Sequence, residues 1–283
     1  MEKIKIITDS TSEVTLEEAK KYDITVLGIS IIFGDKVYRE TIELSNEEFF
    51  NKLEEFGDIP KTQQIPITEI VDEFKKNIDS KIIFFTLSSK GSGTNQTAHM
   101  AREMVMEEYP DADITIIDSM SYSFVYGHWV IEAAKMAKEG KSKDEIVATV
   151  TEGISKTYAY IAVDTLTYLQ KGGRISSSAK IIGNLMDIKP ILIIEDGLIM
   201  SFDKVRGEKK RYFKMADLAI ENADDIQNQK VYILHGNAPD KAETLKNTLL
   251  SKTEVKEVET RIIGASVGSH IGPGIVAIVF QKK

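Results

Sequence analysis

Short apolar runs alternate with segments whose apolar residues recur at helical spacing along the first part of the chain. Runs such as Ile82–Phe85 and Ile114–Ile117 have no polar interruption, which is typical of strands buried in a parallel sheet. This alternation predicts an α/β domain with a Rossmann-like parallel sheet. The predicted strands cover residues 3–8, 25–33, 37–42, 82–85 and 114–117. The predicted helices cover 15–21, 45–55, 121–139 and 142–155, with one further helix capped by Thr68 and a helical pattern after His99 that ends near Glu108.

Hairpin signals are mixed with helices in the second part of the chain. Asp196-Gly197 separates two apolar runs, which is typical of a tight β-hairpin. The glycine-rich segment 264–274, which contains His270, is predicted to be a turn. We therefore expect an N-terminal α/β domain at residues 1–157 and a C-terminal α+β domain at residues 158–283. In the latter, strands are predicted at 158–163, 190–195, 198–205, 230–234, 255–263 and 275–280, and helices at 166–171, 178–186, 211–222 and 240–250.

A polar, glycine-rich turn follows the apolar run Ile82–Phe85 and precedes the helical pattern that ends near Glu108. Such a turn directs backbone N–H groups and hydroxyls to one place, and the helix N-terminus adds a positive dipole. The turn lacks the third glycine of a dinucleotide-binding loop and the Gly-Lys-Ser/Thr ending of a P-loop. It is suited to an anion or a strongly polar head group, and the simpler interpretation is a Ser/Thr helix cap.

Polar turns follow three of the predicted parallel strands, at Asp9-Ser10-Thr11, at Ser88–Thr94 and at Asp118-Ser119. Ligands of open α/β sheets bind beyond the carboxyl ends of the strands, so we expect a ligand site at this edge. Asp9, Asp118 and Asp164 all stand at strand ends. We interpret them as acceptors for turn N–H groups rather than as metal ligands or acid–base groups.

Composition restricts the classes of function. The 283 residues carry a net charge of −8, with a pI of about 5.2, which argues against a general nucleic-acid or anionic-membrane surface. The chain has no cysteine, which excludes disulfides and thiolate chemistry and fits a reducing cytoplasm. No signal-peptide pattern, membrane-span pattern or metal-binding motif is present, so we expect a cytoplasmic protein without membrane insertion.

Six motifs, in order along nearly the whole chain, resemble the DegV family of bacterial fatty-acid-binding proteins. The most specific runs from Asp164 to Ile175 and reads Asp-Thr-Leu-x-Tyr-Leu-x-Lys-Gly-Gly-Arg-Ile. The others are Asp9-Ser-Thr-Ser, Ser92-Gly-Thr94 followed by Gln96, Asp118-Ser119, Lys189-Pro-Ile-Leu192 with Asp196-Gly197, and His270-x-Gly272-Pro-Gly274.

The resemblance implies two α/β domains with a long-chain, palmitate-like fatty acid in an apolar tunnel and its carboxylate at the domain interface. It implies a carrier without catalytic residues, cofactor or metal, which presents the fatty acid to a separate fatty acid kinase for acyl-phosphate formation. It assigns the carboxylate to Thr62, Ser92, Gly93, Thr94 and His270. It places Arg174 and Arg206 near the phosphorylated head group or the docked kinase.

The chain departs from the family pattern at two places near the expected head group. Gln63-Gln64-Ile65 replaces the usual Ser-Gln-Pro after Thr62, and Gly91 replaces an apolar residue before Ser92. We expect these changes to reshape the pocket more than the fold.

Two other functions remain open from the residues alone. A hydrolase or phosphotransferase would use Ser92, His270 or Asp9, although no Gly-x-Ser-x-Gly elbow is present. A small-anion sensor would use the same turn for a wholly polar ligand.

Overall fold

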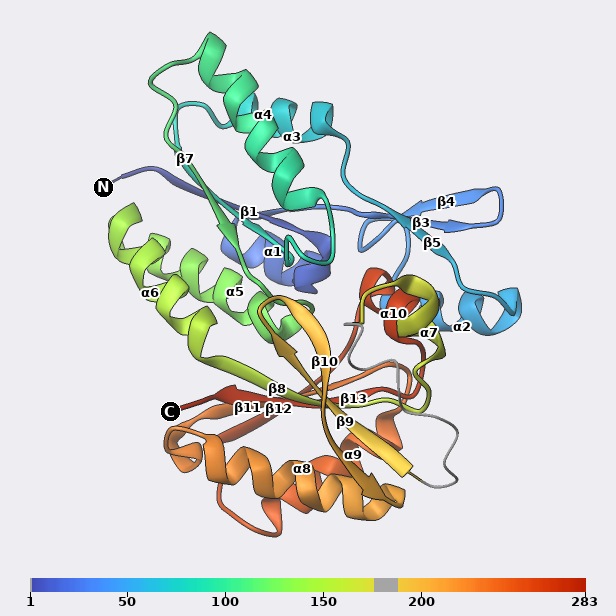
Figure 1. Cartoon of the computed structure of the whole chain (residues 1–283). Helices are drawn as coiled ribbons and strands as arrows, with labels where there is room; N and C mark the ends of the chain where they lie inside the picture. Colours follow the sequence, from blue (N-terminus) through green and yellow to red (C-terminus); the bar gives the residue numbers. More distant parts are fainter. Residues whose placement is uncertain (1, 176–187) are drawn as a thin grey trace. The chain divides into compact units, whose positions relative to one another are not determined.

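The computed structural model describes residues 2–175 and 188–283 (Figure 1). The chain forms two compact units: the first contains Met1–Ser45 and Pro60–Ser155, and the second contains Asn46–Ile59 and Lys156–Lys283. The predicted domain boundary near residue 157 stays a prediction, because compactness alone does not show which segments fold independently. The predicted helix 178–186 lies outside the described residues.

A four-stranded parallel sheet is the centre of the first unit, with the strand order β2-β1-β6-β7, and it confirms the predicted parallel α/β arrangement. Its core side chains, such as Ile7 and Phe84, are fully buried. Helices α3 and α4 cover one face and α1 and α5 the other (Figure 1). The strands are β1 (Ile4–Asp9), β2 (Ile24–Leu27), β6 (Lys81–Thr86) and β7 (Ile114–Asp118); the helices are η1 (Ser10–Ser12), α1 (Leu16–Tyr22), α3 (Ile67–Lys76), α4 (Thr94–Glu108), α5 (Phe124–Lys138) and α6 (Lys143–Lys156).

A smaller antiparallel sheet in the same unit has the order β4-β3-β5, from β3 (Ser30–Phe33), β4 (Lys36–Arg39) and β5 (Lys61–Gln63). The prediction of one strand over 25–33 is wrong, because β2 and β3 belong to different sheets. The interruption has a side-chain cause: the backbone N–H of Ile29 donates to the hydroxyl of Ser10 at 2.9 Å, not to a neighbouring strand.

Two of the predicted helices begin with a capping side chain in the structure, whereas the helix predicted to be capped by Thr68 does not. Thr15 caps α1 with a reciprocal bond to Glu18, and Ser142 bonds Glu145 at the start of α6. Thr68 is not a cap, because α3 already begins at Ile67 behind Pro66. The helix predicted from residue 121 begins at Phe124.

The second unit contains a six-stranded sheet with the order β10-β9-β8-β13-β11-β12, in which only β11 and β12 are parallel. The β9–β10 hairpin across Asp196-Gly197 is confirmed. Helices α8 and α9 pack side chains such as Met215 and Leu245 onto one sheet face. The elements are α2 (Asn46–Phe56), β8 (Thr157–Ala162), α7 (Thr167–Gly172), β9 (Ile188–Glu195), β10 (Leu198–Arg206), α8 (Glu208–Asn222), η3 (Ile226–Asn228), β11 (Lys230–His235), α9 (Pro239–Leu250), β12 (Glu257–Ile262), α10 (Ala265–Ile271) and β13 (Val276–Gln281).

The glycine-rich segment 264–274 contains a helix, α10, so its prediction as a turn throughout is wrong. The reason is packing: a Cβ at Gly268 would lie 2.5 Å from a ring carbon of Phe49 in α2. Glycine is therefore needed there for close approach rather than for a turn.

Candidate functional site

The turn between β6 and α4 is the polar centre of the first unit. The hydroxyl of Ser92 accepts the backbone N–H of Thr94 at 3.2 Å, and the two hydroxyls lie 3.0 Å apart. Ser92 is partly exposed, whereas Thr94 is fully buried. Ser92 therefore closes the turn with a local bond, and Thr94 holds its hydroxyl in place. The interpretation as a Ser/Thr helix cap is wrong, because the N-cap of α4 is Gly93 and has no side-chain cap bond. The predicted role of Ser92 and Thr94 in binding a carboxylate stays a prediction.

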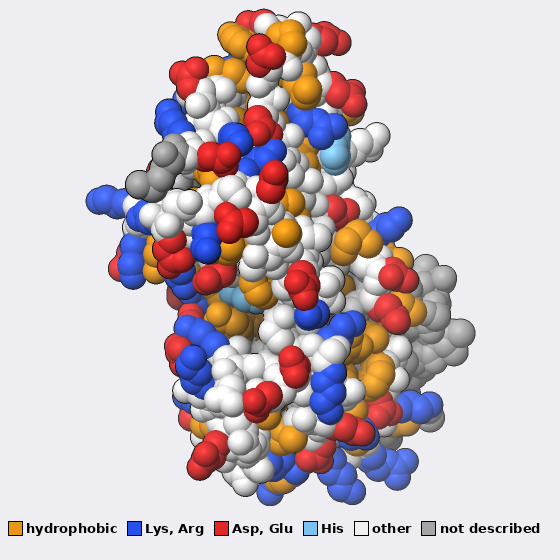
Figure 2. All heavy atoms as spheres, turned by 90° about the vertical axis from the view of Figure 1, so that its left-hand side faces the viewer, with side chains coloured by type: hydrophobic (Ala, Val, Ile, Leu, Met, Phe, Trp, Pro, Cys, Tyr) orange, Lys and Arg blue, Asp and Glu red, His pale blue; other side chains and the backbone are white. Residues whose placement is uncertain are grey.

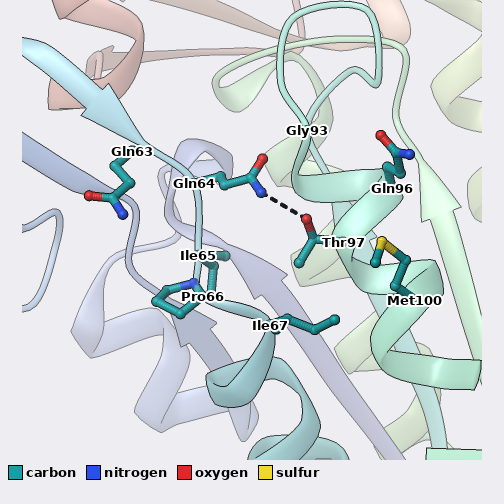
Figure 3. Close-up of a pocket in the computed structure, with 9 residues that line it drawn as sticks. All are labelled: Gln63, Gln64, Ile65, Pro66, Ile67, Gly93, Gln96, Thr97 and Met100. Atoms are coloured by element: carbon teal, nitrogen blue, oxygen red, sulfur yellow. Dashed lines mark hydrogen bonds between the residues drawn. The ribbon is translucent and has the colours of Figure 1, made fainter. Parts of the chain in front are cut away.

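The predicted Thr62 segment reaches this turn through a residue that sequence analysis left without a role. Thr62 lies in β5, opposite Ile31 of β3. Two residues later, the Gln64 amide donates to the hydroxyl of Thr97 in α4 at 2.9 Å (Figure 3). A Cβ at Gly93 would lie 2.2 Å from Oε1 of Gln64, so the Gln64 side chain occupies space that only a glycine leaves open.

A cavity of about 430 Å³ opens beside this contact, lined by residues of the 63–67 segment and of the α4 N-terminus (Figure 3). Its polar end contains Gly93, Gln64 and Thr97, and Ile67 and Met100 contribute apolar walls. No charged side chain lines it within the described parts of the chain. The remaining lining residues are Gln63, Ile65, Pro66 and Gln96.

The second departure from the family pattern is Gly91, and an aromatic side chain occupies the space that a side chain at this position would need. A Cβ at Gly91 would lie 2.4 Å from the hydroxyl oxygen of Tyr122, which is buried. The phenol therefore takes the place of a side chain at position 91. The expected effect of this departure on the ligand pocket stays a prediction.

Asp9 is fully buried at the end of β1, with several donors around its carboxylate. Leu87 N–H donates at 2.7 Å, Thr11 N–H at 3.0 Å and the Tyr126 hydroxyl at 2.7 Å. Burial raises the pKa of Asp9, and these hydrogen bonds oppose the rise. The interpretation as an acceptor for turn N–H groups is confirmed for Asp9, and burial removes it from contact with solvent.

The other two strand-end aspartates differ from each other. Asp118 accepts the backbone N–H groups of Ser89 and Met120 at 3.1 and 3.0 Å, as expected. Asp164 instead forms an ion pair with Lys241 at 2.6 Å.

Two motifs of the second unit, distant in sequence, interlock through glycines. A Cβ at Gly172 would lie 2.6 Å from Nδ1 of His270. A Cβ at Gly272 would lie 2.5 Å from the ring of Tyr168. The Asp164–Ile175 motif and the His270–Gly274 motif therefore form one packed structure, α7 against α10.

His270 lies on α10, partly buried. Burial and, to a lesser extent, the charge of Arg174 lower the pKa of His270 to about 4. The imidazole is therefore neutral near pH 7, where it offers a hydrogen bond rather than a positive charge. Arg174 donates to the carbonyl of Gly172, and Arg206 is exposed at the end of β10.

Two further histidines have local hydrogen-bond partners. His128 bonds the carbonyl of Phe124, and Nδ1 of His235 accepts the N–H of Ala238. No group of three or more potential metal ligands occurs among residues 2–175 and 188–283. Over the same ranges, no helix has the length and apolar character needed to cross a membrane.

Ser92 has Thr94, and not a catalytic base, as its hydrogen-bond partner among the described residues. The Asp9 carboxylate is enclosed by its donors. Neither contact activates Ser92, because activation requires a base within hydrogen-bond reach.

Comparisons with known proteins give one consistent result. Residues 3–283 match the family model described as "Uncharacterised protein, DegV family". A DegV domain-containing protein of Clostridium acetobutylicum is 36% identical over 282 residues, which cover 99% of this chain and 98% of that protein. Protein DegV of Bacillus subtilis is 32% identical and is covered to 99%.

Solved structures agree over the same length. A fatty-acid-binding DegV family protein of Streptococcus agalactiae is 32% identical, with a TM-score of 0.87 and complete coverage of both chains. A DegV family protein of Thermus thermophilus, described in terms of fatty acid binding, is 25% identical, with a TM-score of 0.89 and coverage of 99% of this chain and all of that one.

Proposed function

Because the chain belongs to the DegV family, we propose that it binds one long-chain fatty acid and holds the carboxylate with Ser92 and Thr62. The observation that carries the proposal is the Ser92-Gly93-Thr94 turn at the carboxyl end of β6, which opens α4. Solved relatives at 25% identity or above are described as fatty-acid-binding proteins, which supports it.

The chemistry of the turn suits a carboxylate that must leave water. A buried carboxylate needs hydrogen-bond donors, because an unpaired charge is costly in an apolar environment. Hydroxyls, turn N–H groups and a helix N-terminus are donors that add no formal positive charge. The family resemblance adds His270, which is neutral near pH 7, to the proposed site. Such a site holds the acid while leaving it available to a second protein.

The acyl chain supplies most of the binding free energy in this proposal. Burial contributes about 0.8 kcal/mol per methylene, so a chain of about sixteen carbons yields on the order of 10 kcal/mol before ordering costs. We infer slow release, which suits a carrier. The enclosing apolar tunnel and the location of the carboxylate at the domain interface are parts of the proposal that rest on the family resemblance.

The proposed partner is a fatty acid kinase that phosphorylates the carboxylate while the carrier orients and shields the acyl group. The sequence contains neither a P-loop nor a dinucleotide-binding loop, so the partner would supply nucleotide and metal. Arg174 and Arg206 are proposed to face the phosphorylated head group or the kinase. The proposed location is the cytoplasm.

Solvent extraction of the purified protein, followed by mass spectrometry of the released lipid, tests fatty-acid binding. We expect about one fatty acid per chain, with clear loss in the double variant Ser92→Ala/Thr62→Val because both hydroxyl donors are removed. Thr244→Val, which removes an exposed hydroxyl on α9, is the matched control and should retain the lipid.

Absence of lipid from folded wild-type protein, even after incubation with a panel of fatty acids, would contradict the proposal. Turnover of acyl or phosphate esters that is lost in Ser92→Ala would favour the hydrolase instead. Binding of phosphate esters alone would favour the small-anion sensor.

A further inference from the structure

One exposed face of α4 combines methionines with acidic residues. Met100, Glu103, Met104 and Glu107 follow the spacing i, i+3, i+4, i+7, which places all four on the same side of the helix. Met100 and Met104 are each 50% exposed, and both glutamates are exposed. These four residues are called the α4 face below. The upper end of the space-filling view shows hydrophobic side chains beside acidic ones (Figure 2).

The stability of the helix does not explain this composition. Glu103 and Glu107 are like charges four residues apart, which destabilises a helix, and neither forms an ion pair within the described residues. They lie in the half of α4 where the helix dipole disfavours negative charge, and the last turn has no basic residue. The neighbouring Glu108, by contrast, pairs with Lys75 of α3.

The α4 face continues into the cavity described above. Met100 belongs to both, and its side chain points toward Thr97, with Ile67 of α3 nearby (Figure 3). The surface therefore offers, at one end, an uncharged recess with apolar walls at Ile67 and Met100, and two carboxylates without an ion pair at the other. Methionine side chains are flexible and polarizable, so they adapt to apolar side chains of different shapes.

We propose that the α4 face is a docking site for a basic amphipathic helix of a partner protein. Apolar residues of that helix would pack on Met100 and Met104, with one of them in the recess beside Ile67. Lysine or arginine residues flanking them would pair with Glu103 and Glu107. The carboxylates argue against an anionic lipid surface as the occupant, because such surfaces attract basic segments.

The probe is a synthetic amphipathic helical peptide of leucine and lysine, with its binding to the full chain measured by fluorescence anisotropy. A peptide with the same leucine pattern and glutamate in place of lysine should not bind. Glu103→Lys/Glu107→Lys should weaken binding of the basic peptide about tenfold, because two attractive pairs become repulsive. Met104→Ser should weaken it by about threefold or more.

The matched control separates a local site from the general attraction of an acidic chain for a cationic peptide. Asp35→Lys/Glu139→Lys makes the same change in net charge at two exposed positions of the first unit, outside α4. We expect this variant to bind as wild type within about twofold. Equal weakening in both double variants, or no binding by wild type, would overturn the proposal.

Two further measurements separate docking on the α4 face from helix unfolding and from self-association. Helical content by circular dichroism should be unchanged in the charge variants, and Glu103→Gln/Glu107→Gln should weaken binding less than the lysine variant. Analytical ultracentrifugation tests whether a second copy of the chain occupies the face. Self-association that Met104→Ser abolishes would replace the proposed partner with a homodimer and overturn the proposal.

Discussion

The two units hold their motif residues in different ways. In the first unit, Ser92, Thr94, Gln64 and Thr97 form a network of uncharged groups, and the close contact at Gly93 involves the end of a flexible, exposed glutamine. In the second unit, His270 lies against Gly172 beside Arg174, and Gly272 contacts the Tyr168 ring. The first arrangement is adaptable and insensitive to pH, whereas the second is rigid and titratable.

Alanine substitution of one glycine from each unit gives the largest expected contrast. Gly272 has φ +83° and ψ 175°, a region that essentially only glycine adopts, so Gly272→Ala adds backbone strain to a clash with the Tyr168 ring. We expect a loss of about 2–4 kcal/mol in the free energy of unfolding. Gly93 has φ −76°, which alanine tolerates, so Gly93→Ala should cost less than about 1 kcal/mol once Gln64 moves aside.

Urea unfolding followed by circular dichroism measures both losses. Equal losses for the two variants would show that the contrast between a flexible contact and a rigid one does not hold. Lipid content provides a second readout, because Gly93→Ala displaces Gln64 from the turn proposed to bind the carboxylate.

The second expected difference between the units is the pH dependence of stability that His270 causes in the second unit. The pKa of His270 is lowered from 6.5 to about 4 in the folded protein, so between these values the unfolded state binds more protons. Stability due to the neutral imidazole is therefore complete above about pH 6.5 and is lost as pH falls toward about 4. The loss amounts to roughly 3 kcal/mol at most, at about 1.4 kcal/mol per pKa unit.

The unfolding free energies of the wild type and of His270→Gln are measured as a function of pH. Their difference isolates the contribution of His270, because the contributions of the other titrating groups are the same in both proteins. NMR titration of the His270 ring in Arg174→Gln should show a pKa closer to the ordinary value, because one repelling charge is gone. A difference in unfolding free energy that stays constant between pH 4 and 7 would contradict the lowered pKa of His270. Ser92, Thr94 and Gln64 do not titrate in this range, so their hydrogen-bond network should contribute no such dependence.

Local sequence patterns predicted the parts of the fold that depend on neighbouring residues. The continuous apolar runs predicted the parallel strands of the first unit, and Asp196-Gly197 predicted the β9–β10 hairpin. The same reasoning failed where a distant residue decides. Nothing within the apolar run 25–33 indicates that the N–H of Ile29 donates to the Ser10 hydroxyl, which ends one strand.

Prediction of the candidate site also failed where residues distant in sequence decide the structure. The glycines of the motifs were visible in the sequence, but their partners were not: Gln64 for Gly93, Tyr122 for Gly91 and Phe49 for Gly268. Each pair is brought together by the fold, and a glycine alone does not indicate whether it serves a turn or a close approach. The helix α10 was missed for this reason.

The last prediction concerns Gln64, which joins the Thr62 segment to the α4 turn. Gln64→Ala removes the hydrogen bond to Thr97, whose side chain is buried, and should cost about 1 kcal/mol. Gln63→Ala is the matched control from the same segment, because the Gln63 side chain is exposed and bonds no other described residue. Urea midpoints that shift equally would show that Gln64 does not anchor the segment. A shift confined to Gln64→Ala, together with faster lipid release, would identify this glutamine as the residue that fixes the proposed carboxylate turn.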